Sequence, residues 1–186
     1  MRFLIISGNP QKEGLCHSVM EAIEAGAKAG GDEVQILYTT NIERCRVCGD
    51  GWGTCRTEGY CEFGELDSFH HAEEVVKNAD RICILTPVYW WDMAEGLKSF
   101  LDKLRRCGFG QGGALKGKQV LFVASAGGTG NGVRNCLLQF ENFGKNTKAE
   151  IFDLIGINRW NNDYQKQAAH DAAKAMAEGR KAGETI

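Results

Sequence analysis

The chain has 186 residues, of which 43% are hydrophobic, and this is enough to build the core of one α/β domain. Its 22 Lys and Arg residues against 24 Asp and Glu residues give a formal net charge of −2. There is no excess of cations to neutralise a nucleic-acid backbone, so we exclude nucleic acid as a partner.

Residues 2–7, RFLIIS, contain an apolar run too short for the hydrophobic region of a signal sequence, and no apolar run is long enough to span a bilayer. We therefore expect a cytoplasmic protein that has no membrane partner. Eight cysteines are many for such a chain. Because a reducing compartment keeps thiols free, they predict metal binding or redox chemistry.

Apolar runs of strand length alternate with segments of helical period, which is typical of a parallel sheet with crossover helices. Strands are expected near 2–7, 33–38, 81–86, 118–125 and 150–155. Helices are expected near 17–30, 66–78, 93–106, 131–144 and 162–182. We interpret residues 1–186 as one α/β domain with a five-stranded parallel sheet of order 2-1-3-4-5. A cysteine-rich loop at about 39–65 is inserted in it.

The first strand leads into a small, polar, glycine-containing turn, residues 7–18, and then directly into a helix. We name this segment the first loop. Such a turn aims backbone N–H groups at an anion near the positive end of the helix dipole, which predicts a phosphate site. The alternative is an ordinary βα turn, with His17 or Ser18 near the helix cap.

The aromatic loop, residues 86–93, follows a central strand and contains Tyr89, Trp90 and Trp91 in succession. Ligands of a doubly wound sheet bind at the carboxyl ends of its strands. A flat heterocycle such as isoalloxazine needs apolar walls of this kind, with backbone amides to orient its polar edge. The alternative is that the three rings cap the core or form a subunit interface.

The glycine loop, residues 124–132, follows the next predicted strand and contains four glycines. Glycines let a backbone approach a planar ligand without intervening side chains. One such loop is a weak signal. Three loops after the first, third and fourth strands are a stronger one, because these strand ends flank the switch point of the predicted sheet.

Two stretches near the aromatic loop indicate a family. Pro87-Val88-Tyr89-Trp90 and the following residues 96–103, GLKSFLDK, are similar to a P-V-Y-[FW] loop and a G-x-L-K-x-F-[IL]-D-[RK] helix. The chain thereby resembles the NADPH-dependent FMN reductase and iron–sulfur flavoprotein branch of the flavodoxin-like superfamily, over about residues 1–145. This resemblance implies a flavodoxin-like three-layer sandwich.

The resemblance also implies that FMN binds across the three loops. Where the family usually has S-P-R, this chain has Asn9-Pro10-Gln11, so dipoles are expected to bind the phosphate in place of a cationic side chain. The implied cofactor-binding residues are Ser7, Asn9, Gln11, His17 and Ser18 in the first loop, Pro87, Val88, Tyr89, Trp90 and Trp91 in the aromatic loop, and Ser125, Gly127, Gly128 and Gly130 in the glycine loop.

The cysteine loop, residues 39–65, contains the four predicted metal ligands Cys45, Cys48, Cys55 and Cys61. Iron–sulfur members of the family have C-x2-C-x2-C and a fourth cysteine, which suit a 4Fe-4S cluster. Here four residues are inserted, giving C-x2-C-x6-C-x5-C. Three interpretations stay open: a 4Fe-4S cluster, which we place first, a structural zinc ion, and free or disulfide-linked thiols. The other cysteines, Cys16, Cys83, Cys107 and Cys136, are expected to pack as small apolar residues.

The function that these features imply is an FMN-dependent oxidoreductase. It would pass electrons from NAD(P)H to a small-molecule or redox-protein acceptor such as a quinone, a flavin or an iron–sulfur centre. No catalytic acid–base residue is expected, because the chemistry belongs to the cofactor. The alternative is a non-enzymatic electron carrier of the flavodoxin type, which a net charge of only −2 disfavours.

The segment that follows the aromatic loop also predicts self-association. Leu97, Phe100, Leu101 and Leu104 share one face of a predicted helix. Together with the aromatic loop, this face offers more apolar surface than one flavin covers, and such surface commonly marks interfaces. We therefore expect a homodimer or homotetramer, as in related reductases.

Overall fold

The computed structural model describes residues 1–183, without the side chain of Asp67. Within this range six strands form one sheet. Five of them run parallel in the spatial order β2 (Glu33–Tyr38), β1 (Arg2–Ser7), β3 (Arg81–Tyr89), β5 (Gln119–Ala126) and β6 (Glu150–Asn158). The short β4 (Asp92–Met93) pairs antiparallel with the end of β3. The predicted flavodoxin-like fold and the order of its five parallel strands are confirmed.

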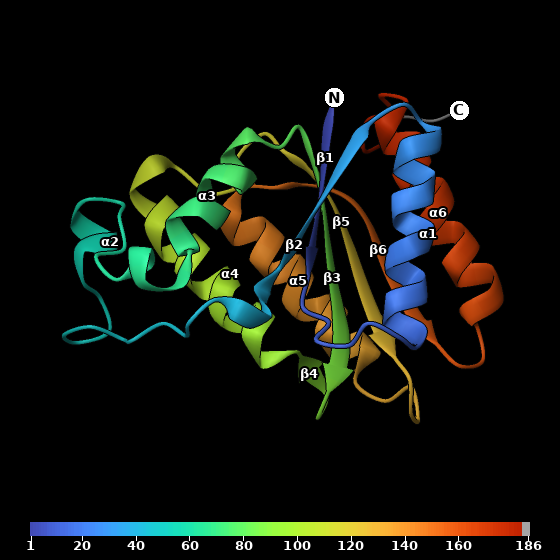
Figure 1. Cartoon of the computed structure of the whole chain (residues 1–186), viewed down its shortest axis with the longest axis horizontal. Helices are drawn as coiled ribbons and strands as arrows, with labels where there is room; N and C mark the ends of the chain where they lie inside the picture. Colours follow the sequence, from blue (N-terminus) through green and yellow to red (C-terminus); the bar gives the residue numbers. More distant parts are fainter. Residues whose placement is uncertain (184–186) are drawn as a thin grey trace.

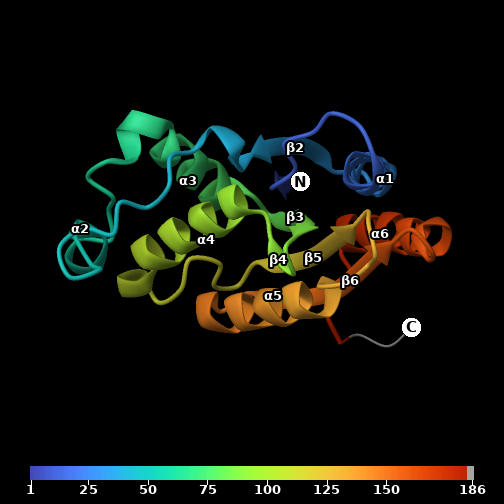
Figure 2. The same cartoon turned by 90° about the horizontal axis from the view of Figure 1, so that it is seen from below.

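Helices cover both faces of the sheet and complete a three-layer arrangement (Figures 1 and 2). One face carries α1 (Leu15–Ala29) and α6 (Asn162–Ala177), and the other carries α3 (Phe69–Asn78), α4 (Glu95–Gly108) and α5 (Val133–Thr147). The described residues also form four short helical segments: α2 (Thr54–Thr57) and the 3-10 turns η1 (Thr39–Asn41), η2 (Gly64–Asp67) and η3 (Phe109–Gln111). No helix of the described chain is long and apolar enough to cross a membrane.

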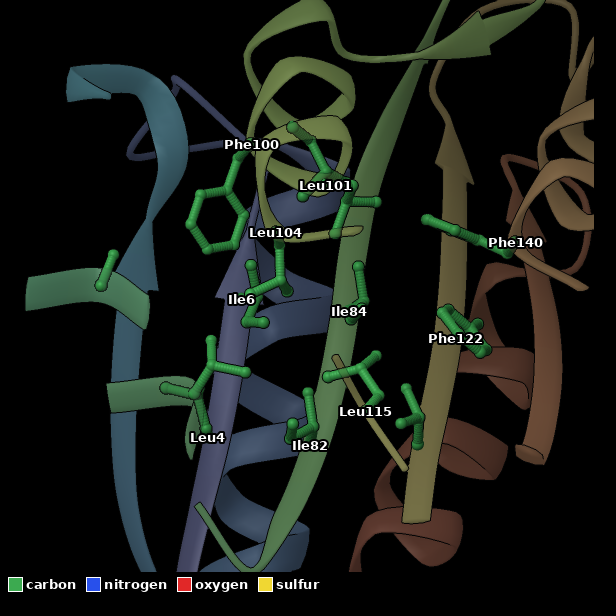
Figure 3. Packing of buried hydrophobic residues seen from close by; sticks show 14 of the residues in the cluster. Leu4, Ile6, Ile82, Ile84, Phe100, Leu101, Leu104, Leu115, Phe122 and Phe140 are labelled. Atoms are coloured by element: carbon green, nitrogen blue, oxygen red, sulfur yellow. The ribbon is translucent and has the colours of Figure 1, made fainter. Parts of the chain in front are cut away.

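The alternation of side chains along the strands builds two cores. In β1, Leu4 and Ile6 pack toward α3, α4 and α5, whereas Phe3 and Ile5 pack toward α1 and α6. The first of these cores is drawn in Figure 3, where Leu4, Ile6, Ile82, Ile84, Phe100, Leu101, Leu104, Leu115, Phe122 and Phe140 meet between the sheet and its helices. Since the central strands are covered on both faces, most of their residues are buried, and each contains a continuous apolar run.

Several boundaries differ from the sequence expectation by a few residues, and two of them have a clear physical reason. Strand β3 continues to Tyr89 and folds back as β4, which at two residues is too short to leave a periodic pattern. Helix α6 ends at Ala177 instead of 182. Gly179 lies just beyond this end with φ of 90°, and its N–H and that of Arg180 donate to carbonyls of the last turn. Glycine therefore terminates the helix.

The cysteine loop leaves the carboxyl end of β2 and runs outward past α4 to α2, which lies at the far end of the molecule from α1 and α6 (Figure 1). Two contacts attach its first part to α4. The Cys45 N–H donates to Ser99 Oγ at 2.9 Å, and Arg44 forms an ion pair with Glu95 at 2.5 Å. The loop is therefore packed along α4.

Candidate functional site

The three loops predicted to bind a ligand lie at one edge of the sheet. Strand β3 lies between β1 and β5, so the segments that follow these strands are neighbours at the carboxyl edge (Figure 1). Two cavities lie at this edge. The larger, which we call the edge cavity, measures about 840 Å³ and lies between the first loop and the aromatic loop. The smaller, of about 200 Å³, lies between the aromatic loop and the glycine loop.

The first loop is held by its own polar groups. Asn9, almost fully buried, donates through Nδ2 to the Gln11 carbonyl at 2.8 Å, and its Oδ1 accepts from the Gln11 N–H at 3.2 Å. Gly8 faces Leu97 of α4 so closely that a Cβ would lie 2.8 Å from the Leu97 Cβ. Only glycine therefore fits where the chain passes α4.

Helix α1 begins after Gly14, and no side chain caps its first turn. Its first N–H groups therefore lack side-chain partners, which is the arrangement that favours an anion. His17 lies in this turn, and its Nδ1 is buried without a hydrogen-bond partner. The Ser18 hydroxyl is already engaged, because it donates to the Leu15 carbonyl at 2.9 Å. Of these two predicted ligands, His17 is the one with an unused polar atom.

The aromatic loop is a tight hairpin whose two turn residues are Trp90 and Trp91. Both have positive φ, 49° and 70°, a conformation that two-residue hairpin turns require and that Asn and Gly normally supply. The Trp91 carbonyl accepts from Asn135 Nδ2 of α5 at 2.9 Å. A Cβ on Gly132 would lie only 2.5 Å from the Trp91 Cα, so the glycine loop also packs against this turn. The neighbouring elements thus hold a turn that its own residues disfavour.

The three rings are largely open to solvent. Trp90 is 96% exposed, Trp91 60% and Tyr89 42%. Trp90 and Val88 line both cavities, so the hairpin forms the wall between them. Burial, and to a lesser extent the nearby Cys16 thiol, raise the pKa of Tyr89. The rings are therefore not part of the core, which was one alternative for them.

The glycine loop combines a buried hydroxyl with open backbone. Ser125 Oγ is buried and has no hydrogen-bond partner. A Cβ added at Gly127 or Gly128 would meet nothing within 4 Å. Gly130 differs, because its Cβ would lie 3.0 Å from the Trp160 ring. Gly127 and Gly128 therefore leave the space that a bound ring or phosphate requires.

The edge cavity includes residues that the sequence did not single out. Its wall contains Gly8, Pro10, Val88, Tyr89 and Trp90 from the predicted loops, together with Thr40, Asp92, Met93, Ala94, Glu95, Gly96 and Lys98. Gly128 and Gly130 line the smaller cavity. The remaining predicted residues, Ser7, Asn9, Gln11, His17, Ser18, Pro87, Ser125 and Gly127, line neither cavity.

A third cavity, the cysteine cavity, brings the four predicted metal ligands together. It is narrow, about 30 Å³, and Cys45, Cys48, Cys55 and Cys61 all line it. Glycines with positive φ, including Gly49 at 57° and Gly51 at 106°, shape the loop around it. Within the described part of the chain, no three Cys, His, Asp or Glu side chains converge closely enough to hold one metal ion.

Helix α4 lines the cysteine cavity and contributes three residues that the sequence did not place at this site. Lys103 is almost fully buried, Arg106 is partly buried, and Cys107 is 1% exposed. Burial, with smaller effects from Glu73 and from the thiols of the cysteine loop, raises the pKa of Cys107 to about 12. Cys107 is a core residue, as predicted, and also a fifth thiol of this cavity.

The other cysteines outside the loop fit the sequence expectation. Cys16, Cys83 and Cys136 are buried among apolar side chains of the two cores. Burial raises the pKa of Cys16 and of Cys136 to about 12, so both thiols stay protonated at neutral pH. They pack as small apolar residues.

The sequence of residues 1–180 matches that of a protein family described as having a flavodoxin-like fold. The chain belongs to this flavodoxin-like family. An iron–sulfur flavoprotein from Methanosarcina thermophila is 32% identical over 144 residues, which cover 75% of this chain and 70% of that protein. An iron–sulfur flavoprotein from Methanocaldococcus jannaschii is 27% identical over 196 aligned residues, with 96% of each chain covered.

Solved structures agree on the fold of this flavodoxin-like chain. The apo form of an NADH:FMN oxidoreductase superposes with a TM-score of 0.65 at 18% identity, covering 96% of this chain and 91% of that one. The resemblance to the FMN reductase and iron–sulfur flavoprotein branch is confirmed.

The strained hairpin of this flavodoxin-like protein gives a stability prediction. Trp91→Gly should raise the free energy of unfolding by about 1 kcal/mol, because glycine adopts positive φ without the steric cost of a Cβ. Urea denaturation without flavin measures it. Trp160, another exposed tryptophan, has no positive φ. Trp160→Gly should therefore lower stability, and a comparable loss in Trp91→Gly would contradict strain at the turn.

Proposed function

We propose that this chain is an FMN-dependent oxidoreductase that takes electrons from NAD(P)H and passes them to a small-molecule or redox-protein acceptor. The observation that supports this best is the carboxyl edge of the sheet. There exposed aromatic rings line a cavity of about 840 Å³, within the usual range for cofactor sites, and the uncapped start of α1 and the open backbone of the glycine loop lie at the same edge of the sheet.

The first turn of α1 would hold the phosphate of FMN. The N–H groups after Gly14 are donors of the right kind, and no acidic residue lies in the first turn itself. His17 Nδ1 has no partner, and it would donate to the phosphate when the ring is protonated, with Nε2 3.6 Å from Glu21. Asn9-Pro10-Gln11 stands where the family that the chain resembles usually has S-P-R, so backbone dipoles would supply most of the attraction. A single anion site suits a mononucleotide with one phosphate.

The aromatic and glycine loops would hold the ring system. Tyr89 and Trp90 offer apolar faces beside the edge cavity, and Gly127 and Gly128 leave room for a planar group. The buried Ser125 hydroxyl, without a partner in the protein, supplies a polar contact. FMN would contribute hydride and single-electron chemistry, while this chain binds it and leaves one face accessible to the nicotinamide.

The cysteine cavity would hold a 4Fe-4S cluster. The donor set fits, because four thiols from one loop line a common cavity and iron–sulfur clusters use four thiolates. In a cluster each thiolate binds its own iron, so the sulfurs surround the centre instead of meeting at one ion. The cavity is narrow, and the loop must open to enclose four irons. Positive-φ glycines at 49, 51 and 59 give it that freedom.

The phosphate site predicts a preference between flavins. FMN should bind more tightly than riboflavin, which lacks the phosphate, and His17→Ala should narrow that difference. Loss of a hydrogen bond to a charged group corresponds to about tenfold in affinity or more. Quenching of flavin fluorescence measures both affinities.

The control for this titration is His71→Ala. His71 is exposed on α3 and lies beside Arg2, at the amino-terminal end of β1 and so at the edge of the sheet opposite the proposed flavin site. Its replacement should leave both affinities unchanged. Equal affinity for FMN and riboflavin in the unmodified protein would contradict the phosphate site.

A second experiment distinguishes the oxidoreductase from the electron carrier. NADH or NADPH alone should reduce FMN bound to the oxidoreductase, whereas an electron carrier needs a partner protein to reduce it.

The metal centre predicts a composition. Protein purified without oxygen should contain about four irons with equal sulfide per chain. Cys48→Ser/Cys55→Ser should lose most of this iron, whereas Cys136→Ala, a buried cysteine on α5, should keep it. One zinc per chain would convert the site to a structural one. If the protein contains neither iron nor zinc and the double variant keeps full activity, the cysteine loop would hold no metal and would only cover the proposed flavin site.

Self-association is the remaining part of this proposal. The Leu97, Phe100, Leu101 and Leu104 side chains are buried in the core of the chain itself, so they are not available to a partner. The exposed rings of Trp90, Trp91 and Trp160 are available to contact a second copy of the chain. We expect light scattering to give the mass of a dimer or tetramer at micromolar concentration. Trp90→Ala should weaken assembly, and a strictly monomeric mass would contradict it.

A further inference from the structure

Arg106 occupies an unusual position on the wall of the cysteine cavity. One of its terminal nitrogens, Nη1, donates to the Gly51 carbonyl, and its guanidinium lies 5.2 Å from the centre of the Trp52 ring. Gly51 and Trp52 belong to the stretch between the second and third cysteines of the loop. The guanidinium is therefore fixed in place by the loop that carries the predicted metal ligands.

A donor of this fixed guanidinium remains unused. Arg106 Nε is buried and has no hydrogen-bond partner, although arginine is always charged and its N–H groups bind acceptors strongly. Leaving a buried donor unsatisfied costs about 1–3 kcal/mol, and more for a charged group. Such groups are rare in folded proteins and often mark a place where another partner binds.

The surroundings of Arg106 indicate which acceptor suits it. Five cysteine side chains line the same cavity. Lys103, one helical turn earlier on α4, lines it as well and is almost fully buried. Arg46 adds a third cation to the lining, and Glu62 contributes one carboxylate, so cationic groups outnumber acidic ones around the five sulfur atoms. An anionic centre made of thiolates and sulfide would supply a sulfur acceptor for the unsatisfied Arg106 Nε and a negative charge beside its guanidinium.

We propose that Arg106 donates a hydrogen bond through Nε to a sulfur of the centre held by the cysteine loop, and that this bond raises the centre's reduction potential. The inference rests on the iron–sulfur centre proposed above. Accepting one electron makes the centre more negative by one charge. A fixed N–H donor with a positive charge stabilises the reduced form more than the oxidised form. Arg106 acts on the centre from the protein side and is not a catalytic residue.

A purely structural role for Arg106 is the competing explanation. The guanidinium holds Gly51 and Trp52 against α4, and Phe109 adds a ring contact to Trp52 at 5.7 Å. Its loss would then loosen the loop without changing the potential of a centre that still forms. The reduction potential therefore distinguishes the two roles, whereas activity alone does not.

The test compares Arg106→Gln and Arg106→Lys with Arg105→Gln. Arg105 is the preceding residue of α4 and lines a different cavity, beside Asp102 and Asn142. Each variant is purified without oxygen, its FMN, iron and sulfide are measured, and its centre is titrated with dithionite under electron paramagnetic resonance. Arg106→Gln should reduce about tenfold less favourably, a midpoint lower by about 59 mV for one electron. Arg106→Lys keeps the charge but lacks the Nε donor, so the potential should recover only in part.

Each other outcome counts against a definite statement. Full iron and an unchanged midpoint in Arg106→Gln would overturn the inference, and so would complete recovery in Arg106→Lys or an equal shift in Arg105→Gln. Loss of iron from both Arg106 variants, with FMN still bound, would establish the structural role instead. An unmodified protein without iron would refute the proposed centre itself, a failure visible before any variant is made.

Discussion

The packing of α4 against the sheet is the constraint on which both candidate sites depend. Leu97, Phe100, Leu101 and Leu104 are buried against β1, β3 and the neighbouring helices, and this fixes the rotation of the helix about its axis (Figure 3). Residues on its other sides then have set positions. Gly96 and Lys98 line the edge cavity, whereas Lys103, Arg106 and Cys107 line the cysteine cavity. At 1.5 Å per residue, Lys98 and Lys103 are separated by about 8 Å along the axis, so one helix sets the spacing between the proposed flavin site and the proposed metal site.

The cysteine loop owes its course to the same helix. Its first part is attached near the amino end of α4, where the Cys45 N–H meets Ser99 Oγ, and its middle is attached near the carboxyl end, where Trp52 lies over Arg106. The stretch between Cys48 and Cys55 is longer than in the compact motif of the iron–sulfur members that the chain resembles. It is nevertheless attached to α4 by specific contacts, because it contains the ring and the carbonyl that Arg106 engages. His70 of α3 completes the support, because its Nε2 lies 2.7 Å from the Cys61 carbonyl.

The sheet order and the three edge loops could be predicted from the sequence because each depends on local patterns. Continuous apolar runs such as 82–85 and 120–124 identify central strands, and a motif such as Pro87-Val88-Tyr89-Trp90 lies within one segment. The hairpin turn could not be predicted, since its signal is Asn-Gly and the chain has two tryptophans with positive φ there. Lys103, Arg106 and Cys107 were missed for another reason. No metal-binding motif lies near them in the sequence, and only the packing of a loop some 50 residues earlier brings them next to the cysteines.

Polar groups without partners connect these observations. Within the described residues, three buried side-chain nitrogen or oxygen atoms lack a hydrogen bond: His17 Nδ1, Ser125 Oγ and Arg106 Nε. Folding normally satisfies buried polar groups, so the positions of these three atoms should be unrelated to the predicted ligand-binding segments if they reflected imperfect packing alone. All three lie instead where the sequence or the structure predicts a ligand, two beside the proposed flavin and one beside the proposed metal centre. These buried polar atoms lack hydrogen-bond partners at the positions where a bound cofactor would supply them. This is expected of a chain whose proposed sites are complete only when they are occupied.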